Sequence, residues 1–140
     1  MFEHFSEKAI KTIFLAQEET RRAKHKIVGT EQILLGLLAE GTGVAAKLLT
    51  NEGVSLELVR SEIEKKFGCG RNWWIPANMS FNSEAKISLQ IAESTALRLN
   101  SSYIDTEHLL LGLLQQPDGR ATLTLQDLAI NITEIITQIV

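Results

Sequence analysis

Two glutamates, Glu31 and Glu107, stand at equivalent positions of a stretch that the sequence contains twice. Residues 30–38 read TEQILLGLL and residues 106–114 read TEHLLLGLL. A carboxylate is a preferred partner of a guanidinium, and the N-terminus of a helix presents N–H groups that bind anions. If the helix expected ahead of this stretch packs beside it, the two N-termini and Glu31 form one pocket. Such a pocket would hold a group that is cationic at one end and anionic at the other.

Each copy of this pattern also has a structural interpretation. Ser6 and Thr30 are the predicted N-caps of the first two helices, because a hydroxyl oxygen accepts a hydrogen bond from a first-turn N–H. Asn82 and Thr106 hold the corresponding positions in the second half. A glutamate in the first turn complements the positive end of the helix dipole and needs no further role. Both interpretations of the two glutamates stay open at this point.

Trp73 and Trp74 are a second candidate for function. They lie in a segment without helical periodicity. The helical pattern before this segment ends at a glycine, and the one after it begins at a cap residue. Aromatic residues exposed in such a connector are typical anchors for a partner protein. The equal alternative is that the two side chains fold back and cover the core.

The other residues with chemical potential form no recognisable motif. The sequence contains no P-loop, no Gly-x-Gly-x-x-Gly and no His-Glu-x-x-His pattern. His4, His25 and His108 are far apart, and Cys69 stands between two glycines without an identifiable base partner. The basic run at residues 21–26 is interpreted as favourable charge at the C-terminal end of a helix. We therefore expect no catalytic residue, no metal site and no cofactor.

A repeat with a constant offset of 76 residues positions these side chains, since Thr30 recurs as Thr106. The Leu-rich stretch in each copy is apolar nearly all round and should be a buried helix. Gly36 and Gly112 lower the helix propensity of that stretch and indicate a close approach by another helix. Ahead of it, one face of an amphipathic helix recurs in both copies, at Ala9, Ile13, Ala16, Thr20 and Ala23 and at Ala85, Leu89, Ala92, Ala96 and Leu99.

Two shorter helical segments complete each half. The last of them, residues 131–140, is rich in β-branched isoleucine, but the repeat favours a helix. The sequence thus predicts an all-α fold, an eight-helix bundle made of two four-helix repeats with pseudo-two-fold symmetry. Residues 1–140 form one domain, with repeat 1 at about 1–68, a connector at about 69–79 and repeat 2 at about 80–140.

The composition narrows the class of protein. The 140 residues are 44% hydrophobic and 22% charged, as in an ordinary globular domain. A net charge of -3 argues against nucleic acid as a partner. The single cysteine favours a reducing compartment, and the Leu-rich runs are shorter than the roughly 20 residues that span a bilayer. We expect no membrane span and a cytoplasmic protein, or one of the chloroplast stroma if a transit peptide has been removed.

Several stretches resemble the N-terminal domain of ClpC-type Hsp100 chaperones, at residues 5–9 (FSEKA), 16–19 (AQEE), 28–37 (VGTEQILLGL) and 41–47 (GTGVAAK). The resemblance covers the entire chain and implies a double Clp-N domain of eight helices. In that family the domain precedes AAA+ ATPase modules, which these residues lack, and receives substrates and adaptor proteins for degradation by the Clp protease. It implies a non-catalytic chain whose partners are Clp chaperone or protease subunits, adaptor proteins or protein substrates.

The resemblance also extends to domains that read phosphorylated arginine. The residues it implies are Ser6 and Glu31 in the first copy, and Asn82 and Glu107 in the second. The second copy departs from the family pattern, because Asp105 replaces a glycine and Glu84 replaces a basic residue. A carboxylate near the phosphate is repulsive, so the first copy is the favoured site.

A stand-alone accessory protein is the alternative function. Chloroplast ClpT proteins resemble Clp-N domains and dock on the Clp protease or modulate its chaperone. The limits at Met1 and Val140 fit a complete small protein of that kind, and they fit a fragment of a full-length chaperone equally well.

Overall fold

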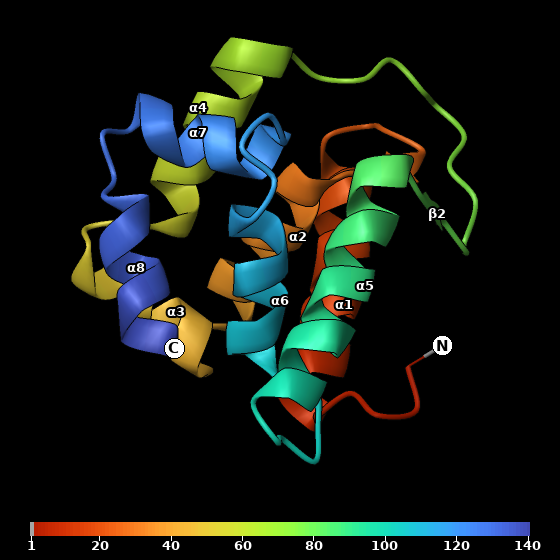
Figure 1. Ribbon diagram of the computed structural model, residues 1–140. Coiled ribbons are helices and arrows are strands. Elements are labelled where there is room, and N and C mark those ends of the chain that lie inside the picture. The colour runs from red at the N-terminus through yellow and green to blue at the C-terminus, as the bar shows by residue number, and fades with distance from the viewer. Residues whose placement is uncertain (1) are drawn as a thin grey trace.

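The computed structural model describes residues 2–140 and contains eight α-helices in this range (Figure 1). The elements are, in chain order, α1 (Glu7–Arg22), β1 (Ile27–Val28), α2 (Thr30–Glu40), α3 (Val44–Asn51), α4 (Leu56–Phe67), β2 (Ser80–Phe81), α5 (Ser83–Arg98), α6 (Thr106–Leu114), α7 (Arg120–Asp127) and α8 (Ile132–Ile139). The predicted all-α class with two four-helix repeats is confirmed, and the two-residue strands are a small departure from it. Within residues 2–140 no single helix is long and apolar enough to cross a membrane, although α2 and α3 together, with a 93° bend between them, have that length and composition.

α1 and α2 form an antiparallel hairpin, and α5 and α6 form its counterpart. The Nζ of Lys8, in the first turn of α1, donates to the carbonyl of Thr42 at 3.3 Å, so the start of α1 lies beside the end of α2. Where the helices cross, a Cβ on Gly36 would lie 2.4 Å from the carbonyl oxygen of Thr12. Gly112 faces the main chain of α5 in the same way, at 2.2 Å. The predicted close approach at these glycines is confirmed.

α2 and α6 lie at the centre of the fold and are buried nearly all round, as predicted. α2 contacts α7 of the other repeat and α6 contacts α3, so each central helix packs against both halves. A leucine side chain that leaves water contributes roughly 1.5–3 kcal/mol, which makes these helices a main source of core stability. Their fully buried large side chains are Ile33, Leu34, Leu37, Leu109, Leu110, Leu111 and Leu113.

Parallel strand pairing joins the two repeats crosswise. β1 pairs with β2, with Val28 opposite Phe81, and Phe5 forms an isolated parallel bridge with Ile104. A helix follows closely after each of these four segments. Because paired parallel segments run in the same direction, the helices that follow them begin side by side. α2 therefore begins next to α5, and α1 begins next to α6.

A connector, residues 69–79, links α4 to β2 along the outside of the molecule (Figure 1). The N–H of Gly70 donates to the carbonyl of Ala23 at 2.8 Å. The main-chain N–H and the side-chain amide of Asn72 both donate to the carbonyl of Lys24, at 3.3 and 3.0 Å. These hydrogen bonds attach the first part of the connector to the end of α1.

Candidate binding pocket at the helix N-termini

The helix N-termini meet across the two repeats. The hydroxyl of Ser6, the N-cap of α1, donates to Oδ1 of Asp105, the N-cap of α6, at 2.8 Å. Asn82, the N-cap of α5, lies beside Gly29, the N-cap of α2, with its Nδ2 3.2 Å from the position of a Cβ on Gly29. The predicted meeting of Ser6 with Thr30 is wrong, because the antiparallel packing of α1 and α2 puts them at opposite ends of the hairpin.

Thr30 and Thr106 bind main-chain amides of the opposite repeat. The hydroxyl oxygen of Thr30 accepts a hydrogen bond from the N–H of Ala121 at 3.2 Å, and that of Thr106 accepts one from Ala45 at 3.3 Å. Both threonines are buried. The predicted N-cap role is wrong by one position, since the residue before each threonine is the N-cap. These hydroxyls tie the repeats together at the first turns of α3 and α7.

Glu31 lies in a pocket of about 220 Å³ at the paired N-termini of α2 and α5, hereafter the Glu31 pocket. The carboxylate is buried, with 4% of the residue exposed. Oε2 accepts a hydrogen bond from Nη1 of Arg120 at 3.1 Å, whereas Oε1 has no partner among residues 2–140. Gly29 makes room for it, since a Cβ there would lie 2.2 Å from Oε1. The lining residues are His25, Ile27, Gly29, Glu31, Gln32, Asn82 and Arg120.

Arg120 is a pocket residue that the sequence interpretation missed. It begins α7, and its guanidinium carbon lies 4.4 Å from the centre of the Phe67 ring, within the range of a cation–π contact. Its side chain is half exposed, so it reaches Glu31 from the solvent side. The equivalent position of the first repeat is Val44. This departure from the repeat is the signal in the sequence that marks Arg120.

The Glu31 pocket combines a buried carboxylate with groups that favour anions. The N-termini of α2 and α5 carry partial positive charge. Oδ1 of Asn82 accepts from the N–H of Ala85 at 2.8 Å, which leaves the Nδ2 donor on the side of Gly29. Oε1 of Gln32 accepts from the N–H of Gly29 at 2.8 Å and holds the turn into α2. The arrangement can bind a cation at the carboxylate and an anion at the helix N-termini.

The second copy differs because the carboxylate of Asp105 lies at the N-termini of α1 and α6. Oδ1 of Asp105 accepts from the hydroxyl of Ser6 and from the N–H of Thr106, both at 2.8 Å. Oε1 of Glu107 is buried without a partner among the described residues, as in the first copy. Glu84 lies in the first turn of α5. Because β1 pairs with β2 and α5 begins next to α2, Glu84 is a neighbour of the Glu31 pocket and not of the second copy. Its side chain is exposed and does not line that pocket.

Trp73 and Trp74 are exposed at 95% and 63%. The alternative that they fold back over the core is wrong, and the next residue, Ile75, packs against the core in their place. The two tryptophans lie apart from the Glu31 pocket, in a separate hollow of about 330 Å³ with Lys26, Arg71 and Asn72.

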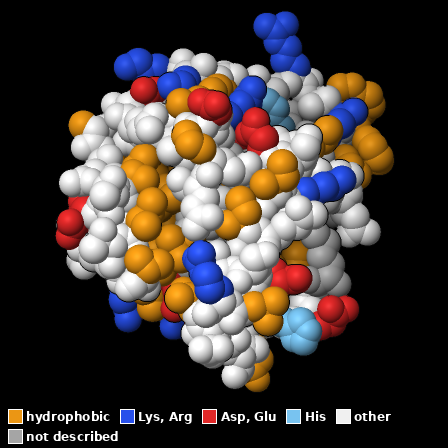
Figure 2. Space-filling model, in the orientation of Figure 1, with side chains coloured by type: hydrophobic (Ala, Val, Ile, Leu, Met, Phe, Trp, Pro, Cys, Tyr) orange, Lys and Arg blue, Asp and Glu red, His pale blue; other side chains and the backbone are white. Residues whose placement is uncertain are grey.

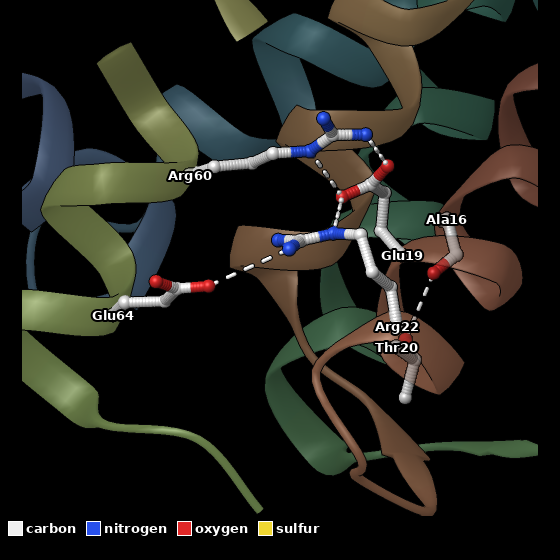
Figure 3. Close-up of polar contacts among 6 residues, drawn as sticks. All are labelled: Ala16, Glu19, Thr20, Arg22, Arg60 and Glu64. Atoms are coloured by element: carbon white, nitrogen blue, oxygen red, sulfur yellow. Dashed lines mark hydrogen bonds and ion pairs between the residues drawn. The ribbon is translucent and has the colours of Figure 1, made fainter. Parts of the chain in front are cut away.

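An ion-pair cluster around the buried carboxylate of Glu19 fastens α4 to α1 (Figure 3). Glu19 accepts two hydrogen bonds from Arg60, at 3.0 and 2.5 Å, and one from Nε of Arg22 at 3.1 Å. Burial raises the pKa of the Glu19 carboxyl, but the hydrogen bonds and charges of the two arginines outweigh it and lower this pKa overall. Arg22 also reaches Glu64 on α4 at 3.5 Å. The start of the basic run thus has a structural role at the end of α1.

The remaining candidates for metal or nucleophile chemistry stay apart. Nδ1 of His108 accepts from the N–H of Asp105 at 2.9 Å, and His25 lines the Glu31 pocket. Cys69 is exposed in the connector. Among residues 2–140, no group of three or more His, Cys, Asp or Glu side chains is placed to hold a metal ion.

Comparison with known sequences gives long and specific matches. The family described as the Clp repeat (R) N-terminal domain matches residues 4–72 and 80–139. The chain is 49% identical over 140 residues to the ATP-dependent Clp protease ATP-binding subunit ClpA homolog of Guillardia theta, and 49% identical over 140 residues to the chloroplastic chaperone protein ClpC of Pisum sativum. These matches cover 100% of this chain but only 17% and 15% of those proteins.

Solved structures share the fold. The N-terminal domain of the chaperone ClpD from Arabidopsis thaliana has a TM-score of 0.84 at 26% identity, over 99% of this chain and 96% of that one. The ClpV N-domain in complex with a VipB peptide has a TM-score of 0.71 at 17% identity, over 94% of this chain and 82% of that one. The second likeness concerns the fold alone.

Proposed function

Because the chain belongs to the Clp repeat N-terminal domain family, we propose that it is a non-catalytic domain that receives substrates or adaptor proteins for an AAA+ unfoldase of the Clp system. The 140 residues form the Clp N-domain and contain no ATPase module. Relatives that are 49% identical over this whole length are named as a chaperone and as an ATP-binding subunit of the Clp protease. A distant N-domain of the same fold was solved with a peptide bound. The proposed compartment is the cytoplasm or the chloroplast stroma, and the relative from Pisum sativum is named chloroplastic.

The observation that carries the proposal is Oε1 of Glu31, which is buried and has no hydrogen-bond partner within residues 2–140. A buried carboxylate oxygen without a donor costs free energy unless a ligand supplies one. The contact between Oε2 and Arg120 at 3.1 Å indicates that a guanidinium fits this carboxylate. The N-termini of α2 and α5 meet at the same pocket, where Nδ2 of Asn82 lies 3.2 Å from the position of a Cβ on Gly29, and these groups favour an anion. An arginine of the partner that carries a phosphate on its guanidinium has both features.

The first copy is proposed as the site in preference to the second. In the second copy Asp105 already occupies the N-termini of α1 and α6. A carboxylate about 4 Å from a phosphate charge costs roughly 4 kcal/mol at an effective dielectric constant of 20. In the first copy the same position is Gly29 and brings no charge.

A pull-down from the native lysate, quantified by mass spectrometry, tests this function. The bait is the chain itself, with Glu31→Gln as the test variant and Glu107→Gln as the matched control from the second repeat. We expect adaptors or a broad set of degradation substrates that Glu31→Gln loses and Glu107→Gln keeps. Clp protease or chaperone subunits as the main catch, captured equally by all three baits, would contradict the proposal and favour the ClpT-like accessory role.

A further inference from the structure

The two tryptophans of the connector have no role in the Glu31 pocket. They are the only tryptophans in the chain, and Trp73 is almost fully exposed. Tryptophan is among the residue types most enriched at the energetic centres of protein interfaces, where burying a large, rigid ring contributes most. Two adjacent exposed indoles therefore need an explanation that the Glu31 pocket does not supply.

The backbone that carries these indoles is held in place. Gly70 and Asn72 donate hydrogen bonds to the carbonyls of Ala23 and Lys24 at the end of α1. A Cβ on Gly70 would lie 2.0 Å from the carbonyl oxygen of Lys24, so the main chains are in direct contact. The start of the connector is thus fastened immediately ahead of Trp73. A surface fixed before binding loses less conformational entropy when a partner docks.

The surroundings of the indoles are positively charged. Trp73 and Trp74 line a hollow of about 330 Å³ with Lys26, Arg71 and Asn72. Lys26 and Arg71 are exposed and form no ion pair within the part of the chain that the structure describes. This local charge contrasts with the net charge of -3 of the whole chain. The upper right of Figure 2, where Figure 1 places the connector, shows hydrophobic and basic side chains next to one another.

We propose that this connector surface, formed by Lys26, Arg71, Trp73 and Trp74, docks an acidic segment of a partner protein that carries apolar side chains. The carboxylates of the segment pair with the two unpaired cations, and its apolar side chains cover the indoles. Opposite charges speed the encounter and fix the register, while burial of the indoles provides the affinity. Two cations are too few for the many phosphate contacts that hold nucleic acid. The partner is therefore a protein, and this surface is separate from the Glu31 pocket.

Tryptophan fluorescence measures this surface directly, because both tryptophans lie on it. The probe is a short synthetic peptide that alternates glutamate with leucine, and its controls replace glutamate by lysine or leucine by serine. We expect a saturable blue shift with the Glu–Leu peptide, weakening as salt rises, and no shift with either control. Lys26→Glu combined with Arg71→Glu should lower the affinity by about tenfold or more. Glu31→Gln should leave the affinity unchanged, which separates this surface from the proposed receptor site.

Several results would overturn the proposal. One is the absence of a shift with the Glu–Leu peptide, and another is an equal shift with its lysine counterpart. A response that persists in the double charge reversal, with folding verified by circular dichroism, would do the same. A shift with single-stranded RNA or with vesicles of anionic lipid, where the peptide gives none, would assign the surface to a different class of partner.

Discussion

Replacing Arg120 by valine, the residue at the equivalent position 44, removes the guanidinium that now contacts Glu31. In the native chain a ligand guanidinium must displace Arg120 from Oε2 of Glu31 before it can use both oxygens. A hydrogen bond between charged groups is worth roughly 1.5–3 kcal/mol. Because the Arg120 side chain is 50% exposed, we take the lower end, about 1.5 kcal/mol. Arg120→Val should therefore bind phosphoarginine about tenfold more tightly than the native chain.

Isothermal titration calorimetry with phosphoarginine provides the assay. Glu31→Gln should abolish the heat of binding, and Arg120→Lys, which keeps the charge but loses the planar fork, should lie between the native chain and Arg120→Val. Glu107→Gln is the control that should behave like the native chain. Weaker binding by Arg120→Val would refute the reasoning, because it would mean that Arg120 holds the phosphate and does not compete with the ligand.

Three further predictions concern stability, each measured by urea unfolding. Glu19→Gln should lower the free energy of unfolding at neutral pH by roughly 2–3 kcal/mol, because it removes the charge of the buried carboxylate that pairs with Arg60 and Arg22. The pKa of Glu19 is lowered in the folded state. The stability lost in Glu19→Gln should therefore have its full size above the unfolded-state pKa of about 4.3 and shrink as the pH falls below it. A loss that does not change with pH would contradict the pKa argument. Gly36→Ala should cost about 1–3 kcal/mol despite its better helix propensity, since the Cβ meets main chain at 2.4 Å, and a stabilised variant would disprove that approach. Leu111→Ala, at a fully buried site, should cost roughly 2–5 kcal/mol, and an unchanged midpoint would contradict the central position of α6.

The repeat made most of the fold predictable from the sequence. Hydrophobic periodicity at a fixed offset identified the helices, and the repeat correctly outweighed the β-branched content of α8. Gly36 and Gly112 were informative because a glycine inside a Leu-rich helix has few explanations other than close packing. Burial of the two central helices followed from their lack of a polar face.

The pairing of β1 with β2 and of Phe5 with Ile104, which joins the two repeats crosswise, was not predictable in the same way. β1 and β2 have two residues each, too few to show an alternating pattern. The short link between α1 and α2 does favour an antiparallel pair, and this should have separated Ser6 from Thr30. The departure from the repeat marks Arg120 in the sequence, but neither propensity nor spacing shows that it reaches Glu31, 89 positions away. The pocket therefore depends on tertiary packing that local sequence signals do not contain.

An NMR titration of the uniformly ¹⁵N-labelled native chain with phosphoarginine tests most directly whether the Glu31 pocket is the binding site. The pocket combines the start of α2 with the start of α5. The account predicts that the largest amide shifts fall on residues 29–32 and 82–84 together. Residues 105–108, where Asp105 occupies the helix N-termini, should not respond. Largest shifts at residues 105–108, or at the connector residues 71–74, would contradict it.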